Sequence, residues 1–209
     1  FCGLTSAEPC YRQIWIYRNL VIAYAEFKQI REKLEDPAFR GWFLPFAANV
    51  TNSSGVVQRC DGKGHCSDLF HTPSQRPGGD CGSIPCGWYV FDHRNQSLRE
   101  WIINDLMLGS RYGLGNKSVS GFYLDDWWTV DGPTEVNHFF PGTGLPHRGQ
   151  EIAEIQGNWS ITAWQAQTAI AKAGGYTWSN INCELDRKPG YGGAPEDCVP
   201  CGLTKSEGY

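Results

Sequence analysis

Strand-like and helix-like segments alternate along this chain of 209 residues, which predicts an α/β fold arranged as a (β/α) barrel of the TIM type. Short apolar runs are followed by stretches with helical spacing or by long loops, and polar residues stand where the runs end. Right-handed crossovers would bring the carboxyl ends of such strands to one face. A closed eight-stranded barrel takes about 250 residues. The length therefore predicts a partial or reduced barrel with disulfide-stapled loop insertions.

The elements are expected in a regular order. Strands are predicted at residues 13–18, 41–46, 87–92, 119–126 and 176–181, because these runs are rich in aromatic and β-branched side chains. Helices are predicted at 20–35, 97–106 and 160–173, where apolar residues recur every three or four positions. The capping box Ser97-Leu-Arg-Glu100 would begin the second helix, and Gly174-Gly175 would end the third.

The composition is that of one globular domain spanning residues 1–209. Hydrophobic residues make up 41% of the chain and charged residues 19%, which suffices for a sizeable core. The net charge of −4 leaves no broad basic surface, so neither nucleic acid nor an anionic membrane is expected as a partner. No apolar run reaches the roughly 18 residues that span a bilayer. A neutral polymer such as a polysaccharide is the better partner for such a surface.

The cysteines predict disulfide bonds and an oxidising compartment. The chain has nine: Cys2, Cys10, Cys60, Cys66, Cys81, Cys86, Cys183, Cys198 and Cys201. They crowd a cysteine-rich loop at 49–86 and a tail at 183–209 that is rich in Gly, Pro and Cys, and their pairing cannot be read from the sequence. The odd count leaves one thiol unpaired or bonded between chains, and a bond between chains would build a homo-oligomer.

Glycosylation sequons support the same conclusion independently. Five of the ten asparagines stand in Asn-x-Ser/Thr sequons, whereas random placement of Ser and Thr would give about one or two. These are Asn49, Asn52, Asn95, Asn116 and Asn158. The chain begins at Phe1 without a charged leader, so a signal peptide is expected to be already removed or to lie outside this sequence. The expected localisation is secreted and extracellular, in a eukaryote.

The segment Val119-Ser-Gly-Phe-Tyr-Leu-Asp-Asp-Trp-Trp128 carries the strongest functional signal. An apolar strand runs into two adjacent carboxylates, Asp125 and Asp126, and then into two indoles. Carboxylates supply acid, base and nucleophile for glycosidic bond cleavage, and aromatic rings stack on sugar rings. The alternative is that an aspartate caps the following turn or binds Ca²⁺ together with Glu135, while the tryptophans belong to the core.

Parallel strands would bring polar clusters from four strand ends to one rim. Asp92 and Asp125 follow consecutive predicted strands, so their carboxyl groups are expected within the spacings that glycosidases use. The candidate catalytic residues are Asp92, Asp125 and Asp126, with Asp125 favoured because it shares a strand face with Tyr123. Substrate-binding candidates are Tyr17, Arg18, Asn19, His93, Arg94, Trp127, Trp128, Trp178 and Asn180. Trp15, Trp42 and Trp88 lie within predicted strands and are expected in the core. Neither a cofactor nor a metal site is predicted.

Three motifs support a resemblance to a known family. They are Trp-Ile-Tyr-Arg-Asn at 15–19, Tyr-Val-Phe-Asp-His-Arg-Asn at 89–95 and Gly-Phe-Tyr-Leu-Asp-Asp-Trp-Trp at 121–128. Over roughly residues 11–182, the chain resembles a group of secreted eukaryotic proteins that look like glycoside hydrolases of the TIM-barrel type. The resemblance implies a barrel that acts on a polysaccharide. It implies no assigned catalytic pair, and the chain departs from a complete barrel in its length.

Two functions follow as hypotheses. The first is a secreted glycoside hydrolase that cleaves a polysaccharide with paired carboxylates at the carboxyl ends of barrel strands. The second is a non-catalytic extracellular glycoprotein that binds glycans or self-assembles into a structural polymer.

Overall fold

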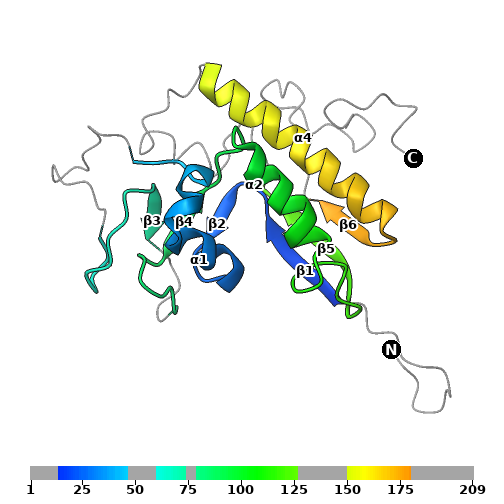
Figure 1. The fold of residues 1–209 in the computed structure, drawn as a ribbon, viewed down its shortest axis with the longest axis horizontal. Helices are drawn as coiled ribbons and strands as arrows, with labels where there is room; N and C mark the ends of the chain where they lie inside the picture. Colours follow the sequence, from blue (N-terminus) through cyan, green and yellow to red (C-terminus); the bar gives the residue numbers. More distant parts are fainter. Residues whose placement is uncertain (1–13, 47–59, 74–78, 127–149, 180–209) are drawn as a thin grey trace, which may run out of the picture.

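The computed structural model describes residues 14–46, 60–73, 79–126 and 150–179, which form two three-stranded sheets packed with helices (Figure 1). The strands are β1 (Ile14–Asn19), β2 (Ile22–Tyr24), β3 (His71–Pro73), β4 (Gly87–Val90), β5 (Val119–Asp125) and β6 (Tyr176–Ser179). The helices are α1 (Lys28–Glu35), α2 (Gln96–Trp101) and α4 (Gln150–Lys172), with the 3-10 helix η1 (Pro37–Trp42) and the π-helix η2 (Ile102–Met107). The parallel sheet has the order β1-β5-β6, and the antiparallel sheet has the order β2-β4-β3.

The prediction of a TIM-type barrel is wrong for this chain. β4 runs antiparallel to both of its neighbours, whereas a barrel of this type needs every strand to run in the same direction. Within the described ranges, β1 pairs with β5 and β5 with β6, so the parallel strands form a small sheet separate from the antiparallel one. The strands of the chain are therefore divided between a parallel sheet and an antiparallel sheet.

A tight turn after β1 explains why β2 lies where a helix is predicted. The side-chain oxygen of Asn19 accepts hydrogen bonds from the backbone N–H groups of Val21 (2.9 Å) and Ile22 (2.6 Å), which turns the chain out of the parallel sheet. Ile22 is then only 1% exposed on β2. The helical spacing belongs to α1 alone, which buries Ile30 and Leu34.

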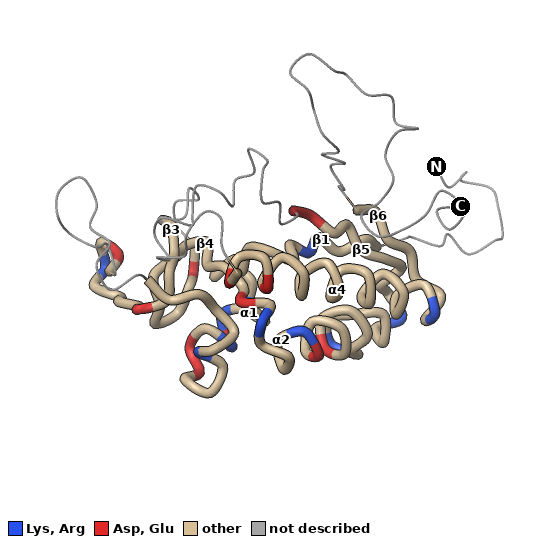
Figure 2. Tube along the Cα trace, turned by 90° about the horizontal axis from the view of Figure 1, so that it is seen from above, with Lys and Arg blue, Asp and Glu red and all other residues tan. Residues whose placement is uncertain are grey.

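The parallel sheet is covered by helices on one side. Side chains alternate along a strand, so Phe122 and Leu124 of β5 point to one side while Tyr123 and Asp125 point to the other. Phe122 and Leu124 are buried in the main core with residues of α2, η2 and α4. Figure 2 shows α2 and α4 together on one side of β1 and β5. This packing leaves the side with Asp125 for other contacts.

Two helices begin at residues other than the predicted ones. Asn95 caps α2 instead of Ser97, because its side-chain oxygen accepts from the N–H groups of Ser97 (3.0 Å) and Leu98 (3.3 Å). α4 starts at Gln150, well before the predicted residue 160. Its first turns bury Ile152 against residues of the antiparallel sheet.

The segment at 41–46 does not form the predicted strand. η1 continues to Trp42, after which Phe43 and Pro45 make isolated bridges to Phe91 and Leu69. Proline lacks the N–H group that a continuous ladder needs, which agrees with a single bridge at Pro45.

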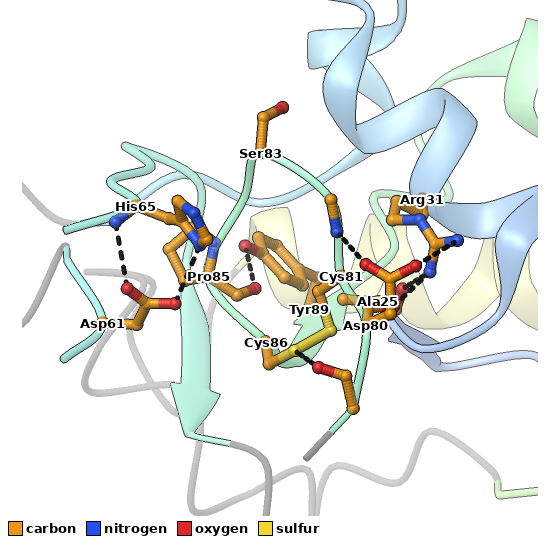
Figure 3. The surroundings of a disulfide bond; sticks show 12 residues. Ala25, Arg31, Asp61, His65, Asp80, Cys81, Ser83, Pro85, Cys86 and Tyr89 are labelled. Atoms are coloured by element: carbon orange, nitrogen blue, oxygen red, sulfur yellow. Dashed lines mark hydrogen bonds and ion pairs between the residues drawn. A yellow bond between two sulfur atoms is a disulfide. The ribbon is translucent and has the colours of Figure 1, made fainter. Parts of the chain in front are cut away.

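Disulfide bonds staple the cysteine-rich loop, as predicted. Cys60 pairs with Cys66 and Cys81 with Cys86, and the remaining cysteines lie outside the described residues. The loop closed by Cys81 and Cys86 is attached to the core (Figure 3). Cys81 is 4% exposed, and the hydroxyl of Tyr89 on β4 donates to the carbonyl oxygen of Pro85 at 2.9 Å. Over the four described ranges, none of the helices has the length and apolar character to cross a membrane.

Candidate functional site

The carboxyl ends of β1 and β5 carry a connected set of polar side chains. The hydroxyl of Tyr17 donates to Asp125 Oδ2 at 2.8 Å, and its oxygen lies 3.3 Å from the hydroxyl oxygen of Tyr24 on β2. Nδ2 of Asn19 donates to Asp126 Oδ2 at 2.5 Å and lies 3.4 Å from both tyrosine hydroxyl oxygens. We call Tyr17, Asn19, Tyr24, Asp125 and Asp126 the polar cluster.

Strand pairing places these residues together. β1 and β5 are parallel and in register, with Tyr17 opposite Tyr123 and Asn19 opposite Asp125. Residues at alternate positions of a strand share one side of the sheet, so Tyr17, Asn19 and Asp125 face the side that α2 and α4 do not cover. In open sheets of parallel strands, ligands bind beyond the carboxyl ends. The polar cluster stands at that position.

Burial raises the pKa of both tyrosines of the polar cluster. Tyr17 is half-buried, and the cost of burying a phenolate raises its pKa far above the ordinary value of 10, with the hydrogen bond to Tyr24 acting in the same direction. Burial also raises the pKa of Tyr24, and the nearby charges of Asp126 and Asp125 raise it further. Tyr17 is therefore a neutral hydroxyl donor to Asp125 at physiological pH.

Asp126 holds a backbone conformation that is uncommon outside glycine. Its φ is +60°, in the left-handed region. Such a residue costs of order 1 kcal/mol, and strained residues of this kind concentrate at functional sites. The turned backbone and the hydrogen bond from Asn19 together hold the second acid of the Asp125-Asp126 pair within the polar cluster.

Aromatic rings extend from the polar cluster across the same side of the parallel sheet. Trp15 and Tyr176 approach to 6.2 Å between ring centroids over Gly121, which has no side chain to separate them. The next row holds Tyr17, Tyr123 and Trp178, with centroid separations of 5.8 Å and 6.1 Å. Trp178 is 70% exposed and Tyr176 is 57% exposed. We call Trp15, Tyr17, Tyr123, Tyr176 and Trp178 the aromatic face.

The structure does not bring Asp92 into the polar cluster. Asp92 follows β4 of the antiparallel sheet, and Arg94 holds both of its carboxylate oxygens, from Nε at 2.9 Å and from Nη2 at 2.7 Å. Arg94 also pairs with Glu151 of α4 at 3.0 Å, and the pKa of Arg94 is raised mainly by its hydrogen bond to Asp92. Asp92 and Arg94 therefore stabilise the turn that leads into α2, and Arg94 links this turn to α4 through Glu151.

Arg18 and His93 are buried and support the backbone beside the site. Arg18 is 7% exposed on the helix-covered side of β1, where it donates to the carbonyl oxygens of Tyr17 (3.2 Å) and Tyr112 (2.9 Å). Burial lowers the pKa of Arg18 to about 10. His93 is 0% exposed, and its Nε2 lies 2.6 Å from the carbonyl oxygen of Leu20. Neither side chain is placed to contact a ligand on the aromatic face.

Several residues of the site are not expected from the sequence. Trp15 is expected in the core but is 41% exposed, because it lies on the side of β1 that faces away from the helices. Tyr24 lies in a stretch predicted as helix, so its contact with Tyr17 cannot be foreseen. Tyr176 is in phase with Trp178, and alternation along β6 would have identified it as a neighbour.

Other predicted residues lie outside the described part of the chain: Trp127, Trp128, Glu135 and Asn180, with the sequons at Asn49 and Asn52. The remaining sequon asparagines are partly exposed. Asn95 caps α2, Asn116 accepts from the N–H of Ser118 at 3.0 Å, and Asn158 donates to the carbonyl of Glu154 at 2.8 Å.

A cavity of about 470 Å³ lies between the end of α1, η1 and the loop closed by Cys60 and Cys66. It shares no lining residue with the polar cluster or the aromatic face. Among the described side chains, no group of three His, Cys, Asp or Glu residues is placed to hold a metal ion.

The sequence matches no protein-family model and no curated protein. Function is therefore inferred from the geometry of the polar cluster and the aromatic face.

Proposed function

We propose that this chain is a secreted carbohydrate-binding protein whose glycan lies along the aromatic face and ends at the polar cluster. The observation that carries the proposal is the placement of exposed rings and hydrogen-bonding groups on one side of the parallel sheet. A sugar ring presents an apolar C–H face and a rim of hydroxyl groups. The exposed rings can stack on the C–H face, and Tyr17 and Asp125 can form hydrogen bonds with the hydroxyl groups.

Covering the exposed rings supplies the main favourable free energy. A sugar that removes roughly 100 Å² of ring surface from water gains about 2–3 kcal/mol at about 25 cal/mol per Å². A hydrogen bond to a charged carboxylate such as Asp125 adds about 1.5–3 kcal/mol. Micromolar affinity corresponds to about −8 kcal/mol after the cost of ordering both partners. Contacts with several rings and the polar cluster together are therefore required.

Secretion is supported by two further features. The described part of the chain contains two disulfides, and disulfides persist in oxidising compartments. The sequence adds five sequons, which accept glycans only along the secretory route. An extracellular polysaccharide would be accessible to a protein at that location.

Hydrolysis of the bound glycan is the second candidate function. The observation that favours it is the pair of carboxylates, Asp125 and Asp126, at one end of the aromatic face, with the hydroxyl of Tyr17 donating to the first. Glycosidases use one carboxyl group as acid and a second as nucleophile or base. The two acids of the polar cluster are the candidates for these roles.

Asp125→Ala is expected to weaken the affinity for a soluble oligosaccharide about tenfold or more, because it removes a charged hydrogen-bond acceptor. Titration calorimetry with a panel of oligosaccharides measures the change. Asp105→Ala removes an exposed carboxylate from η2 and should leave the affinity unchanged. Binding of no panel member by the wild type, or equal affinity in Asp125→Ala, would contradict the proposal. Turnover by the wild type that is lost in Asp125→Ala would establish the second candidate.

A further inference from the structure

His93 is fully buried between the two sheets and α4. Its Nε2 lies 2.6 Å from the carbonyl oxygen of Leu20. A carbonyl oxygen can only accept, so Nε2 carries the proton and donates it. Nδ1 faces the hydroxyl oxygen of Thr162 on α4 at 3.4 Å, and that hydroxyl donates to the carbonyl of Asn158 at 2.7 Å. The hydrogen bond from Nε2 to Leu20 therefore orients the imidazole ring, whereas the 3.4 Å approach of Nδ1 to Thr162 is a packing contact, because the single hydroxyl proton of Thr162 goes to Asn158.

The backbone of His93 is fixed as well. Nη1 of Arg99 donates to the carbonyl oxygen of His93, and the imidazole packs edge-on against Phe91 with 6.2 Å between ring centroids. The N–H of Phe91 donates in turn to the carbonyl of Val21 at 3.0 Å. His93 therefore presents its Nε2–H group to the turn between β1 and β2 from a rigid position.

The peptide groups of Leu20 connect His93 to the polar cluster. The N–H of Leu20 donates to the backbone carbonyl of Asp125 at 3.3 Å, and its own carbonyl accepts from His93. The preceding residue, Asn19, uses its side-chain oxygen to close the turn and its Nδ2 to hold Asp126. A shift of Leu20 would therefore move both the backbone of Asp125 and the side chain of Asn19.

We propose that His93 is a positioning residue for the glycan site, which holds the Leu20 peptide and thereby sets the geometry of Asn19 and Asp125. The part of this inference that concerns ligand affinity rests on the proposed function. His93 itself does not touch the ligand, because no part of its side chain is exposed. An unsatisfied buried carbonyl at Leu20 would be costly, so without the His93 donor the turn is expected to rearrange.

Two substitutions separate positioning from general stability. His93→Leu removes the donor at similar volume, whereas His93→Gln places an amide N–H group where imidazole Nε2 lies. Ile170→Val serves as the control, because it loosens the main core from α4 without removing a hydrogen bond to Leu20. Amide hydrogen exchange at Leu20, divided by exchange at Phe122 in the middle of β5, removes the contribution of global unfolding.

His93→Leu is expected to raise the Leu20/Phe122 exchange ratio about tenfold and to weaken oligosaccharide affinity by a similar factor. In His93→Gln and in Ile170→Val, the exchange ratio and the affinity should both equal the wild-type values. Equal acceleration at Leu20 and Phe122, or no recovery in His93→Gln, would overturn the positioning role. Unchanged affinity in His93→Leu would overturn its link to the site. If the wild type binds no oligosaccharide, the proposed function fails, and the exchange ratio still decides whether His93 holds Leu20.

Discussion

Phe122→Ala is expected to lower the free energy of unfolding by about 3–5 kcal/mol. Phe122 is 0% exposed in the middle of β5 and belongs to the main core with residues of α2, η2 and α4. Truncation to Ala removes the transfer free energy of the ring and leaves a cavity that the surrounding helices fill only in part. It also takes away the ring beneath the buried guanidinium of Arg18, which lies 5.9 Å from the ring centroid.

Urea denaturation followed by circular dichroism measures this loss. Trp178→Ala is the matched control, because Trp178 is 70% exposed on the neighbouring strand and its removal should change stability by about 0.5 kcal/mol or less. Equal losses in the two variants would show that the helix-covered side of the parallel sheet is not the core.

Acidification from pH 7 to pH 4 is expected to cost about 3 kcal/mol of stability through His93 alone. Burial lowers the pKa of His93 from 6.5 to about 4 in the folded protein. Between these values the unfolded chain binds a proton that the folded protein does not bind, so stability falls as the pH falls. The loss begins near pH 6.5 and levels off below about pH 4, where both states are protonated. Burial lowers the pKa of His71 as well, which adds a loss of the same sign.

The measurement is the free energy of unfolding at several pH values for the wild type and for His93→Gln. Glutamine keeps the donor to Leu20 but does not titrate, so the variant should lose markedly less stability between pH 6.5 and pH 4. Nearby charges do not reverse the sign: Asp92 raises the pKa of His93 and Arg99 lowers it, both less than burial does. Parallel pH profiles for the two proteins would contradict the assignment.

The parallel sheet could largely be predicted from the sequence. The runs that form β1, β5 and β6 are rich in aromatic side chains and bounded by polar or turn residues, and all three are strands where predicted. Once β1 and β5 are taken as parallel neighbours, the meeting of Tyr17, Asn19 and Asp125 follows from strand alternation. This part of the polar cluster could be predicted because the alternation of side chains along a strand depends only on residues that are close in the sequence.

The antiparallel sheet could not be predicted, because its pairing depends on contacts between distant segments. Ile22 fits both a helical and a strand pattern, and only its partner Val90 on β4 decides between them. The direction of β4 decides where Asp92 lies, and the adjacent Arg94 then holds its carboxylate. An apolar run with an aspartate at its end does not state the strand direction, so Asp92 and Asp125 look equivalent in the sequence.

The central proposal is that glycan binds on the aromatic face, and a comparison of two exposed tryptophans tests it most directly. Trp178 lies on the aromatic face at 70% exposure, and Trp164 lies on α4 at 56% exposure. Calorimetric titration with the tightest oligosaccharide of the panel should show about tenfold to hundredfold weaker binding for Trp178→Ala and unchanged binding for Trp164→Ala, since a stacked ring contributes roughly 1.5–3 kcal/mol. Wild-type affinity in Trp178→Ala, or an equal loss in Trp164→Ala, would contradict it.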